Sequence, residues 1–505
     1  MKQVQKKSID KAVTQTLLAA RHRRIPLAWD RAETQQPQCG FGRLAICCND
    51  CQEGPCRVNP FGDAGQSTIC GRERNDLVSR YLLNKAADGA LALAKLADEY
   101  GGVSNELLRS ILIADDEMLL SRNYDERLIM IGQDTAEILA TICQSKHSIF
   151  GNWQPGITET NLGILQADAI NIVLHGHVPS RVVAGIKAAA EGLQSPVVFG
   201  SICSNEWNGG FSIPALTNYD SQETPLLTGA VDLLIVGSQC VMPAVVKLAD
   251  NMGVAVSSAA ALKDFADYAA IADRAQNAFK RRVNKPPVIP AVKARVDAGY
   301  TADNTAGLFE LLTEGHAGEK IKGVVYLGGC GSITNTQDSQ PVALATAFIE
   351  AGYLIVSSGC AGVALAKAGM CQPDWNDGQY KLKSVLPDGI PPVINVGSCQ
   401  DAGEFLRMAK CLKQNNIPLA AIFPEVNHNK VLATAISFAV AGIDSWMGFD
   451  PVFADSATTE WLNTELFAKV GARVMPLAEP AEMLQILAET ASNKSLLQKQ
   501  QTSNE

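Results

Sequence analysis

The sequence predicts an α/β multidomain protein in which an all-helical N-terminal domain is followed by two domains built on parallel sheets. Two patterns predict this class. Leucine, isoleucine and alanine recur at helical spacing from about residue 73 to 145. After residue 165, short β-rich runs alternate with alanine-rich segments, as they do in βαβ units. The 505 residues, 47% of them hydrophobic, are enough for about three domains with filled cores.

The expected elements follow in chain order. Helices are expected over residues 75–100 and 105–120, where helical periodicity is continuous. Strands are expected in short apolar runs, namely 170–174, 196–199, 232–236, 323–327, 353–356, 392–396 and 419–423.

A polar, proline-containing stretch suggests the domain boundary. It runs from Arg274 through KRRVNKPPVIP to about Pro290, and Pro286 and Pro287 resist both helix and central strand. The expected divisions are a helical N-terminal domain, a middle domain, a C-terminal domain and a solvated tail, over residues 1–160, 161–285, 286–490 and 491–505.

Charge and hydropathy exclude two classes of partner. A formal net charge of −9 argues against nucleic-acid binding, which calls for a basic surface. No apolar run reaches membrane-spanning length. Residues 1–20 contain no long apolar core, so we expect no signal peptide and a location in the reducing cytoplasm.

Six cysteines fall within residues 39–70, which is the density of an iron-sulfur site. Four of them, Cys48, Cys51, Cys56 and Cys70, supply the thiolates that one [4Fe-4S] cluster needs. Glycines and a proline around them let the backbone curl around a cluster. A zinc site would use isolated pairs at short spacing, and a disulfide framework would need a small secreted chain, so neither alternative fits.

Cys39 and Cys47 are then left over. Two thiolates cannot complete the ligands of a four-thiolate cluster, but a two-fold axis would bring a matching pair from a second chain. The pair therefore predicts a cluster shared across a homodimer.

A second set of metal-type ligands follows the expected strands. Its members are His177, Cys203, Cys240, Cys330, Cys360 and Cys399. Sites in open parallel sheets form at the carboxyl ends of strands, so these side chains are expected to converge. Small residues before most of them would let the backbone approach a bulky inorganic cluster. Thiolate and imidazole together suit nickel, iron or zinc, and six ligands exceed one tetrahedral ion, so the site should be polynuclear.

The alternative for any one of these cysteines is a small buried hydrophobe. That interpretation is given to Cys143, Cys371 and Cys411, which do not follow expected strands. Five cysteines and a histidine at equivalent strand ends are better explained as ligands.

The motifs CGFG, CCNDCQEGPCR, ICG, HGHVP, SICSNE, QCVMP, GGCGS, SSGCAG, VGSCQD and PEVNHNK resemble those of the catalytic subunit of anaerobic nickel-iron carbon monoxide dehydrogenases. The resemblance covers nearly the whole chain apart from its ends. It implies a helical domain and two Rossmann-like domains in a homodimer. Cys39 and Cys47 would hold the cluster between subunits, and Cys48, Cys51, Cys56 and Cys70 the next cluster inward.

The resemblance also implies an activity. The six strand-end residues would ligate a cluster of nickel, iron and sulfur that converts carbon monoxide and water to carbon dioxide, two protons and two electrons. A ferredoxin-like carrier would accept the electrons. Lys430 matches a lysine that the family places beside the small-molecule substrate, whereas His428 is interpreted as a surface residue. Glu206 is either a hydrogen-bond acceptor behind a ligand or an acid at a helix N-terminus.

Three departures from the family bear on activity. Family members carry proton-transferring histidines on the helix after Cys70, but Leu91 and Leu93 occupy that stretch and residues 23–146 contain no histidine. SICSNE has one cysteine where the family usually has two. The segment between Cys70 and His177 is also shorter than usual, which would leave the centre more open to solvent.

These departures leave two alternatives open. The hybrid cluster proteins reduce hydroxylamine on a similar scaffold with an iron-sulfur-oxygen cluster, and this alternative predicts iron without nickel. A redox sensor or electron-transfer dimer is the non-enzymatic alternative, and it predicts clusters without either activity.

Overall fold

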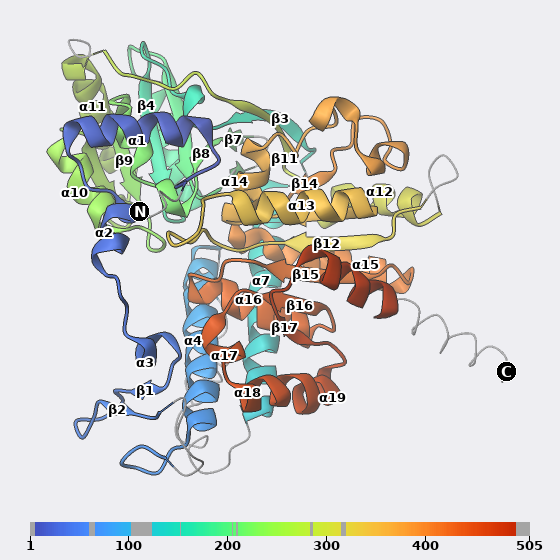
Figure 1. Cartoon of the computed structure of the whole chain (residues 1–505). Helices are drawn as coiled ribbons and strands as arrows, with labels where there is room; N and C mark the ends of the chain where they lie inside the picture. Colours follow the sequence, from blue (N-terminus) through green and yellow to red (C-terminus); the bar gives the residue numbers. More distant parts are fainter. Residues whose placement is uncertain are drawn as a thin grey trace.

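The computed structural model describes residues 6–59, 66–100, 102, 124–151, 153–204, 206–208, 211–282, 286–314 and 320–490. It confirms the expected class: a helical N-terminal region and two mainly parallel sheets (Figure 1). The helix expected over 105–120 and the tail expected over 491–505 lie outside the described residues.

The N-terminal region is mostly helical, as expected. Its helices are α1 (Lys11–Arg23), α2 (Ala28–Thr34), α3 (Gly40–Arg43), α4 (Arg74–Ala97) and α7 (Tyr124–Phe150), with the 3-10 turn η1 (Asp98–Tyr100) after α4. Two short strands interrupt it, β1 (Cys47–Cys48) and β2 (Cys56–Arg57). The Asp76 carboxylate accepts a hydrogen bond from the Glu73 N–H at 3.1 Å, which satisfies a free donor at the start of α4.

The smaller sheet has the strand order β10-β9-β4-β5-β8, and all its pairs are parallel. Its strands are β4 (Ile170–His175), β5 (Val197–Ile202), β8 (Ala215–Thr217), β9 (Val231–Val236) and β10 (Ala255–Ser258). Its helices are α8 (Ser180–Ala190), α9 (Thr224–Leu227), α10 (Pro243–Asn251) and α11 (Phe265–Arg282), and a small hairpin is formed by β6 (Glu206–Asn208) and β7 (Phe211–Ile213).

The linker expected from Arg274 begins later than predicted, because α11 continues to Arg282. The Arg282 guanidinium is buried and lies 2.9 Å from the Asp232 carboxylate on β9. That ion pair fixes the end of the helix to the sheet, a long-range contact that the local polar sequence did not reveal.

The larger sheet has the order β17-β16-β15-β12-β13-β14-β11-β3. Its strands are β3 (Gly156–Thr160), β11 (Ala294–Ala298), β12 (Gly323–Leu327), β13 (Tyr353–Ser357), β14 (Val393–Asn395), β15 (Leu419–Phe423), β16 (Asp444–Met447) and β17 (Val474–Pro476). Only the edge strand β3 is antiparallel, to β11. The helices of this part are α12 (Ala302–Glu314), α13 (Ser339–Ala351), α14 (Gly359–Lys367), α15 (Gly403–Gln414), α16 (Asn429–Val440), α17 (Asp450–Phe453), α18 (Ser456–Trp461) and α19 (Phe467–Val470).

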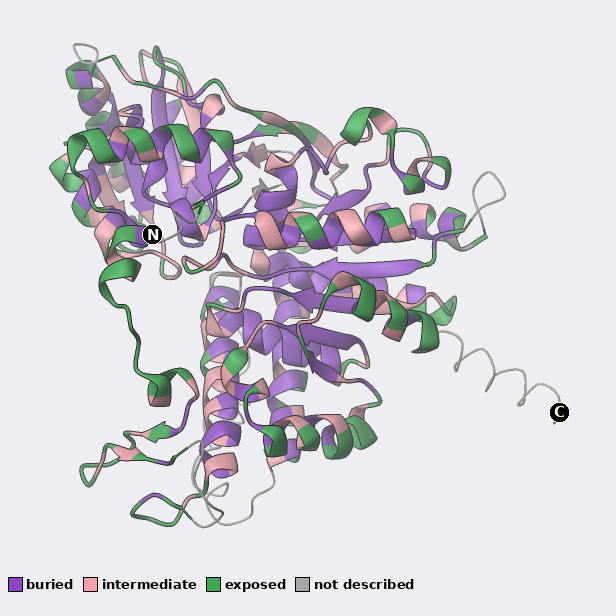
Figure 2. Ribbon diagram, viewed as in Figure 1, coloured by how far each residue is buried: buried purple, intermediate pink, exposed green. Residues whose placement is uncertain are grey.

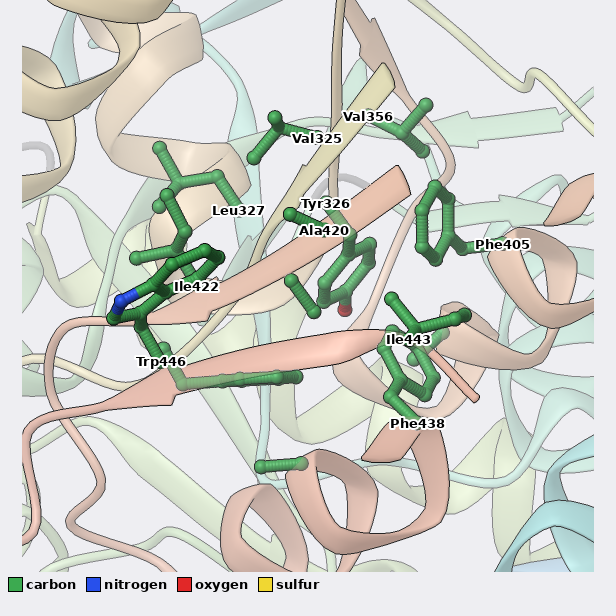
Figure 3. Packing of buried hydrophobic residues seen from close by; sticks show 14 of the residues in the cluster. Val325, Tyr326, Leu327, Val356, Phe405, Ala420, Ile422, Phe438, Ile443 and Trp446 are labelled. Carbon is green, nitrogen blue, oxygen red and sulfur yellow. The ribbon is translucent and has the colours of Figure 1, made fainter. Parts of the chain in front are cut away.

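The helical region and the larger sheet share one hydrophobic core, which contains residues of α4, α7 and α16 as well as the strands. Figure 3 shows Tyr326 of β12 lying among Phe405, Phe438 and neighbouring strand residues. Its hydroxyl is 2.7 Å from the Ser358 hydroxyl, so the buried polar atom is satisfied. Burying each such large side chain stabilises the fold by roughly 1.5–3 kcal/mol.

Two glycines let α16 lie close to the N-terminal helices. A Cβ at Gly89 of α4 would be 2.0 Å from the Asn429 carbonyl oxygen, and one at Gly132 of α7 would be 2.6 Å from the Val440 side chain. Only glycine permits these approaches. Because Lys430 is in the first turn of α16, this packing also fixes the position of that lysine. Within the described part of the chain, no helix is both long and apolar enough to cross a membrane.

Candidate metal centre

The six strand-end residues come from both sheets. His177, Cys203 and Cys240 follow β4, β5 and β9 of the smaller sheet, and Cys330, Cys360 and Cys399 follow β12, β13 and β14 of the larger sheet. Contacts across the two sets show that the loops meet. The Cys399 Sγ is 3.4 Å from the His177 Nε2, and Cys203 and Cys360 belong to the same buried cluster of side chains. The expected convergence at the carboxyl ends of strands is therefore present between the two sheets.

The backbone turns sharply at these residues. Three of them adopt left-handed conformations that are rare for non-glycine residues, with φ of 58° at His177, 85° at Cys203 and 62° at Cys240. Before the other cysteines the left-handed residue is a glycine, as at Gly329 and Gly359. Each non-glycine case costs on the order of 1–3 kcal/mol, and such strain concentrates at functional sites.

The small residues beside the ligands have a different role from the expected one. A Cβ at Gly237 would be 2.1 Å from the Gly176 carbonyl oxygen, and one at Gly359 would be 2.9 Å from the Cys399 Cβ. These glycines bring neighbouring ligand loops into direct contact. The close approach is therefore between backbone segments, and the expectation that they make room for an inorganic cluster is not needed to explain them.

Burial sets the protonation of the donor atoms. It holds the pKa of His177 well below its ordinary value, so the imidazole is neutral, the form that binds metals. Burial raises the pKa of Cys240 to about 11 and that of Cys330 well above the ordinary thiol value. Five thiols grouped with a neutral histidine become good ligands once bound cations displace their protons.

The donors as they lie do not form a ready-made site for a single ion. No three His, Cys, Asp or Glu side chains in the described ranges are arranged to hold one ion. Thiolates on a single tetrahedral ion lie about 3.8 Å apart, given metal–sulfur bonds of about 2.3 Å. A cluster of several metal atoms distributes its ligands over a larger volume, so this donor set fits the polynuclear expectation.

The Lys430 ammonium group lies beside the thiols of the six strand-end residues. The residue is 1% exposed, and its Nζ has no hydrogen-bond partner among the described residues. Burial alone would lower its pKa, but the neighbouring thiols, Cys399 and Cys240 first among them, raise it. A buried cation without a carboxylate partner is costly unless an anionic group occupies the adjacent space. Metal-bound thiolates, or an anionic substrate, would supply that charge.

His428 differs from its sequence interpretation, and one of the two alternatives for Glu206 is excluded. His428 is half-buried and caps α16, where its Nδ1 accepts a hydrogen bond from the Lys430 N–H at 3.2 Å. Glu206 begins strand β6 and accepts a hydrogen bond from the Ser204 hydroxyl at 3.0 Å, so it is not at a helix N-terminus.

A buried ion pair supports the Cys399 loop, and sequence reasoning missed it. The Asp401 carboxylate accepts hydrogen bonds from the Ser398 N–H and hydroxyl, both at 2.8 Å. Its other oxygen is 2.5 Å from the Lys146 Nζ, and both partners are buried. Lys146 lies on α7, 255 positions away, so no local signal in the sequence could have found it.

The cysteine-rich segment is built differently. Strands β1 and β2 pair Cys48 with Cys56, and Gly54 packs against the carbonyl oxygens of Cys48 and Cys51. The Arg72 guanidinium is 3.7 Å from the Cys48 Sγ, and the Thr68 hydroxyl is 3.3 Å from the Cys70 Sγ. These contacts place Cys48 beside Cys56 and hold the thiols of Cys48 and Cys70 near Arg72 and Thr68, and a cluster held by all four cysteines stays a prediction.

Cys39 and Cys47 are exposed, on a part of the chain that lies away from the sheets (Figure 2). Backbone N–H groups of Gly42 and Phe41 at the start of α3 lower the pKa of Cys39. An exposed pair of this kind remains compatible with a cluster shared by two chains. Cys143 and Cys371 are buried in helix and sheet packing, as their structural interpretation expects, and Cys411 is half-buried.

The chain belongs to the Prismane/CO dehydrogenase family, whose sequence pattern matches residues 106–481. It is 26% identical to carbon monoxide dehydrogenase 2 of Carboxydothermus hydrogenoformans over 634 aligned positions, covering 97% of each chain. It is 27% identical to the carbon monoxide dehydrogenase of Rhodospirillum rubrum, covering 91% of this chain and 93% of the relative.

The fold matches that of solved members. Carbon monoxide dehydrogenase IV of Carboxydothermus hydrogenoformans superposes with a TM-score of 0.83 over 97% of this chain and 99% of that one, at 24% identity. The match in fold and length agrees with the resemblance drawn from the motifs.

Proposed function

We propose that the chain is an oxidoreductase of the carbon monoxide dehydrogenase type, acting at a nickel-iron-sulfur cluster held by His177, Cys203, Cys240, Cys330, Cys360 and Cys399. The observation that carries the proposal is the convergence of these donors from two sheets around the buried, unpartnered ammonium of Lys430. The reaction would be the oxidation of carbon monoxide with water to carbon dioxide, two protons and two electrons.

When bound, the cluster would supply a Lewis acid and a redox centre. The residues of the chain would hold the metals and position the substrate. His177 and the five cysteines would hold the metals, and the buried Lys430 ammonium would place a positive charge beside an anionic group of the substrate. The Lys146–Asp401 pair keeps the Cys399 loop in place.

Electrons would leave through the cysteine-rich segment. Cys48, Cys51, Cys56 and Cys70 would hold one [4Fe-4S] cluster per chain, and Cys39 and Cys47 a further one shared in a homodimer. The exposure of the segment supports contact with a second copy and with a ferredoxin-like acceptor.

The test is metal content together with turnover. Protein purified without oxygen should contain nickel as well as iron, and it should reduce a viologen dye with carbon monoxide. Complete iron with no nickel and no carbon monoxide oxidation would refute this function.

The reduction of hydroxylamine is a second candidate, because this chain lacks the proton-transferring histidines that the family uses in carbon monoxide oxidation. Leu91 lines a cavity beside Cys240, and Leu93 is fully buried, so neither replaces the family's proton-transferring histidines. The same protein should then convert hydroxylamine, two protons and two electrons to ammonia and water, and it should contain iron without nickel. The same metal analysis separates the two candidates.

A further inference from the structure

A cavity of about 570 Å³ lies beside the candidate centre. It is formed by one face of α4, by the loop after β9 and by His428. The lining residues used below are Asp88, Leu91, Ala92, Lys95, Gln239 and Cys240. Asp88 and Lys95 are exposed, Leu91 and Ala92 are half-buried, and Cys240 is half-buried. The cavity therefore leads from a charged rim to one of the candidate ligands.

The deep end of the cavity has a polar atom that lacks a partner. The Gln239 side chain donates a hydrogen bond from Nε2 to the Ala92 carbonyl oxygen at 2.7 Å, which ties the ligand loop to α4. Its Oε1 is buried and accepts no hydrogen bond from any described residue. Leaving such an acceptor unsatisfied costs about 1–3 kcal/mol. A small molecule that donates a hydrogen bond would remove this cost.

We propose that this cavity is the route by which small hydrogen-bond donors, from water to molecules of the size of hydroxylamine, reach the Cys240 side of the centre, with Gln239 Oε1 as their acceptor. The charged rim favours polar molecules over apolar gas. Leu91 and Ala92 of α4 line this cavity together with Gln239 and Cys240. The inference rests on the proposed metal centre and on its ability to reduce hydroxylamine, the second candidate reaction.

The test narrows the cavity by substitutions on α4, which carries none of the candidate metal ligands. Ala92→Trp and, independently, Leu91→Trp place an indole in the cavity. Lys85→Trp is the matched control, because it lies earlier on α4 and does not line the cavity. Iron and nickel content and the thermal unfolding temperature establish which variants are intact.

The measurement is stopped-flow reoxidation of the reduced, metal-loaded protein. Hydroxylamine takes two electrons and two protons, its N–O bond breaks, and ammonia and water form. A viologen dye takes electrons from the exposed cysteine-rich segment. We expect either cavity variant to slow reoxidation by hydroxylamine about tenfold or more, with viologen reoxidation unchanged. Lys85→Trp should match the parent in both reactions.

Two results would overturn the inference. One is an intact cavity variant that hydroxylamine reoxidises as fast as the parent. The other is a parent with complete metal content that hydroxylamine does not reoxidise at all. A parent that contains neither nickel nor the iron of the centre would instead refute the proposed function, so the two failures are distinguishable.

Discussion

The two cysteine-containing regions of the molecule contrast in how they are built. In the segment of residues 39–70, the thiols are close in sequence and largely exposed, and short local contacts position them. At the strand ends, the donors are spread over more than two hundred residues, and two sheets bring them together. The first region suits exchange of electrons with another protein, whereas the second suits chemistry that must be shielded from water.

The difference is also energetic. Each strand-end ligand depends on strained backbone, close glycine contacts or a buried ion pair, whereas in the exposed segment the left-handed non-glycine residue is Ala45, which is not a candidate ligand. Positioning the strand-end ligands therefore costs folding free energy that the rest of the fold must supply. Substitutions in the two regions should therefore have different consequences.

The largest expected effect is the loss of a buried ligand. Cys360→Ala should lower viologen-linked carbon monoxide oxidation about 100-fold or more, since changes behind metal ligands alone cost up to about that much. Nickel content should fall, while the iron-sulfur signals of the exposed segment persist. Cys371→Ala is the control, because Cys371 is buried elsewhere in the core. Equal losses in both variants would contradict the ligand assignment.

The next effect concerns the exposed pair. Cys39→Ser should remove about four iron atoms per dimer, the content of one shared [4Fe-4S] cluster. Nickel should be unchanged, because the strand-end ligands are untouched. Iron analysis and the oligomeric state measured by light scattering test this. An unchanged dimer with unchanged iron content would mean that no cluster is shared. Cys411→Ser is the control, and its iron content and oligomeric state should equal those of the parent.

Much of the fold and of both sets of candidate ligands could be predicted from the sequence. The elements that were missed have physical reasons. Local spacing identified the four cysteines around Gly54, and strand patterns predicted β4, β5, β9 and β12 to β15, so the ligands at their ends could be named. The strands β3, β8, β10, β11, β16 and β17 of the two sheets were missed. Of these, β3, β8, β10 and β17 are edge strands and β16 has only four residues, so they carry little periodicity, whereas β11 is an interior strand of five residues. Lys146 could not be assigned, because only the folded chain brings it to Asp401.

That ion pair provides the third prediction, which concerns the support of the buried set. Lys146→Met leaves the Asp401 carboxylate buried without its partner, and this should reduce the free energy of unfolding by about 3–5 kcal/mol. The Cys399 loop should loosen as well, so the magnetic-resonance signal of the centre should change while that of the exposed segment does not. Lys146→Arg, which keeps the charge, should restore the signal. A stability loss with an unaltered signal would show that the pair does not position the ligand.

The smallest expected effect concerns the link between the two regions. Cys360 is in the first turn of α14 and Lys367 is its last residue, and the Lys367 Nζ lies 3.0 Å from Asp10, the N-cap of α1, and 2.5 Å from Asp338. Helix α1 leads towards the cysteine-rich segment. Burial alone would raise the pKa of Asp10, but the Lys367 ammonium lowers it below the ordinary value. The pair therefore contributes stability above the unfolded-state pKa of about 3.9, and this contribution is lost as the pH falls through the folded-state pKa.

Lys367→Met should consequently destabilise the protein most near neutral pH, where the Asp10 carboxylate would be buried and charged without its partner. The difference in free energy of unfolding between parent and variant should shrink as the pH approaches about 4, because protonation of Asp10 removes its unpaired charge. Denaturant unfolding at several pH values measures it. Nickel content and the exposed clusters should both survive, since neither set of ligands is touched. A difference that does not depend on pH would mean that lost packing, and not lost charge pairing, connects the two regions.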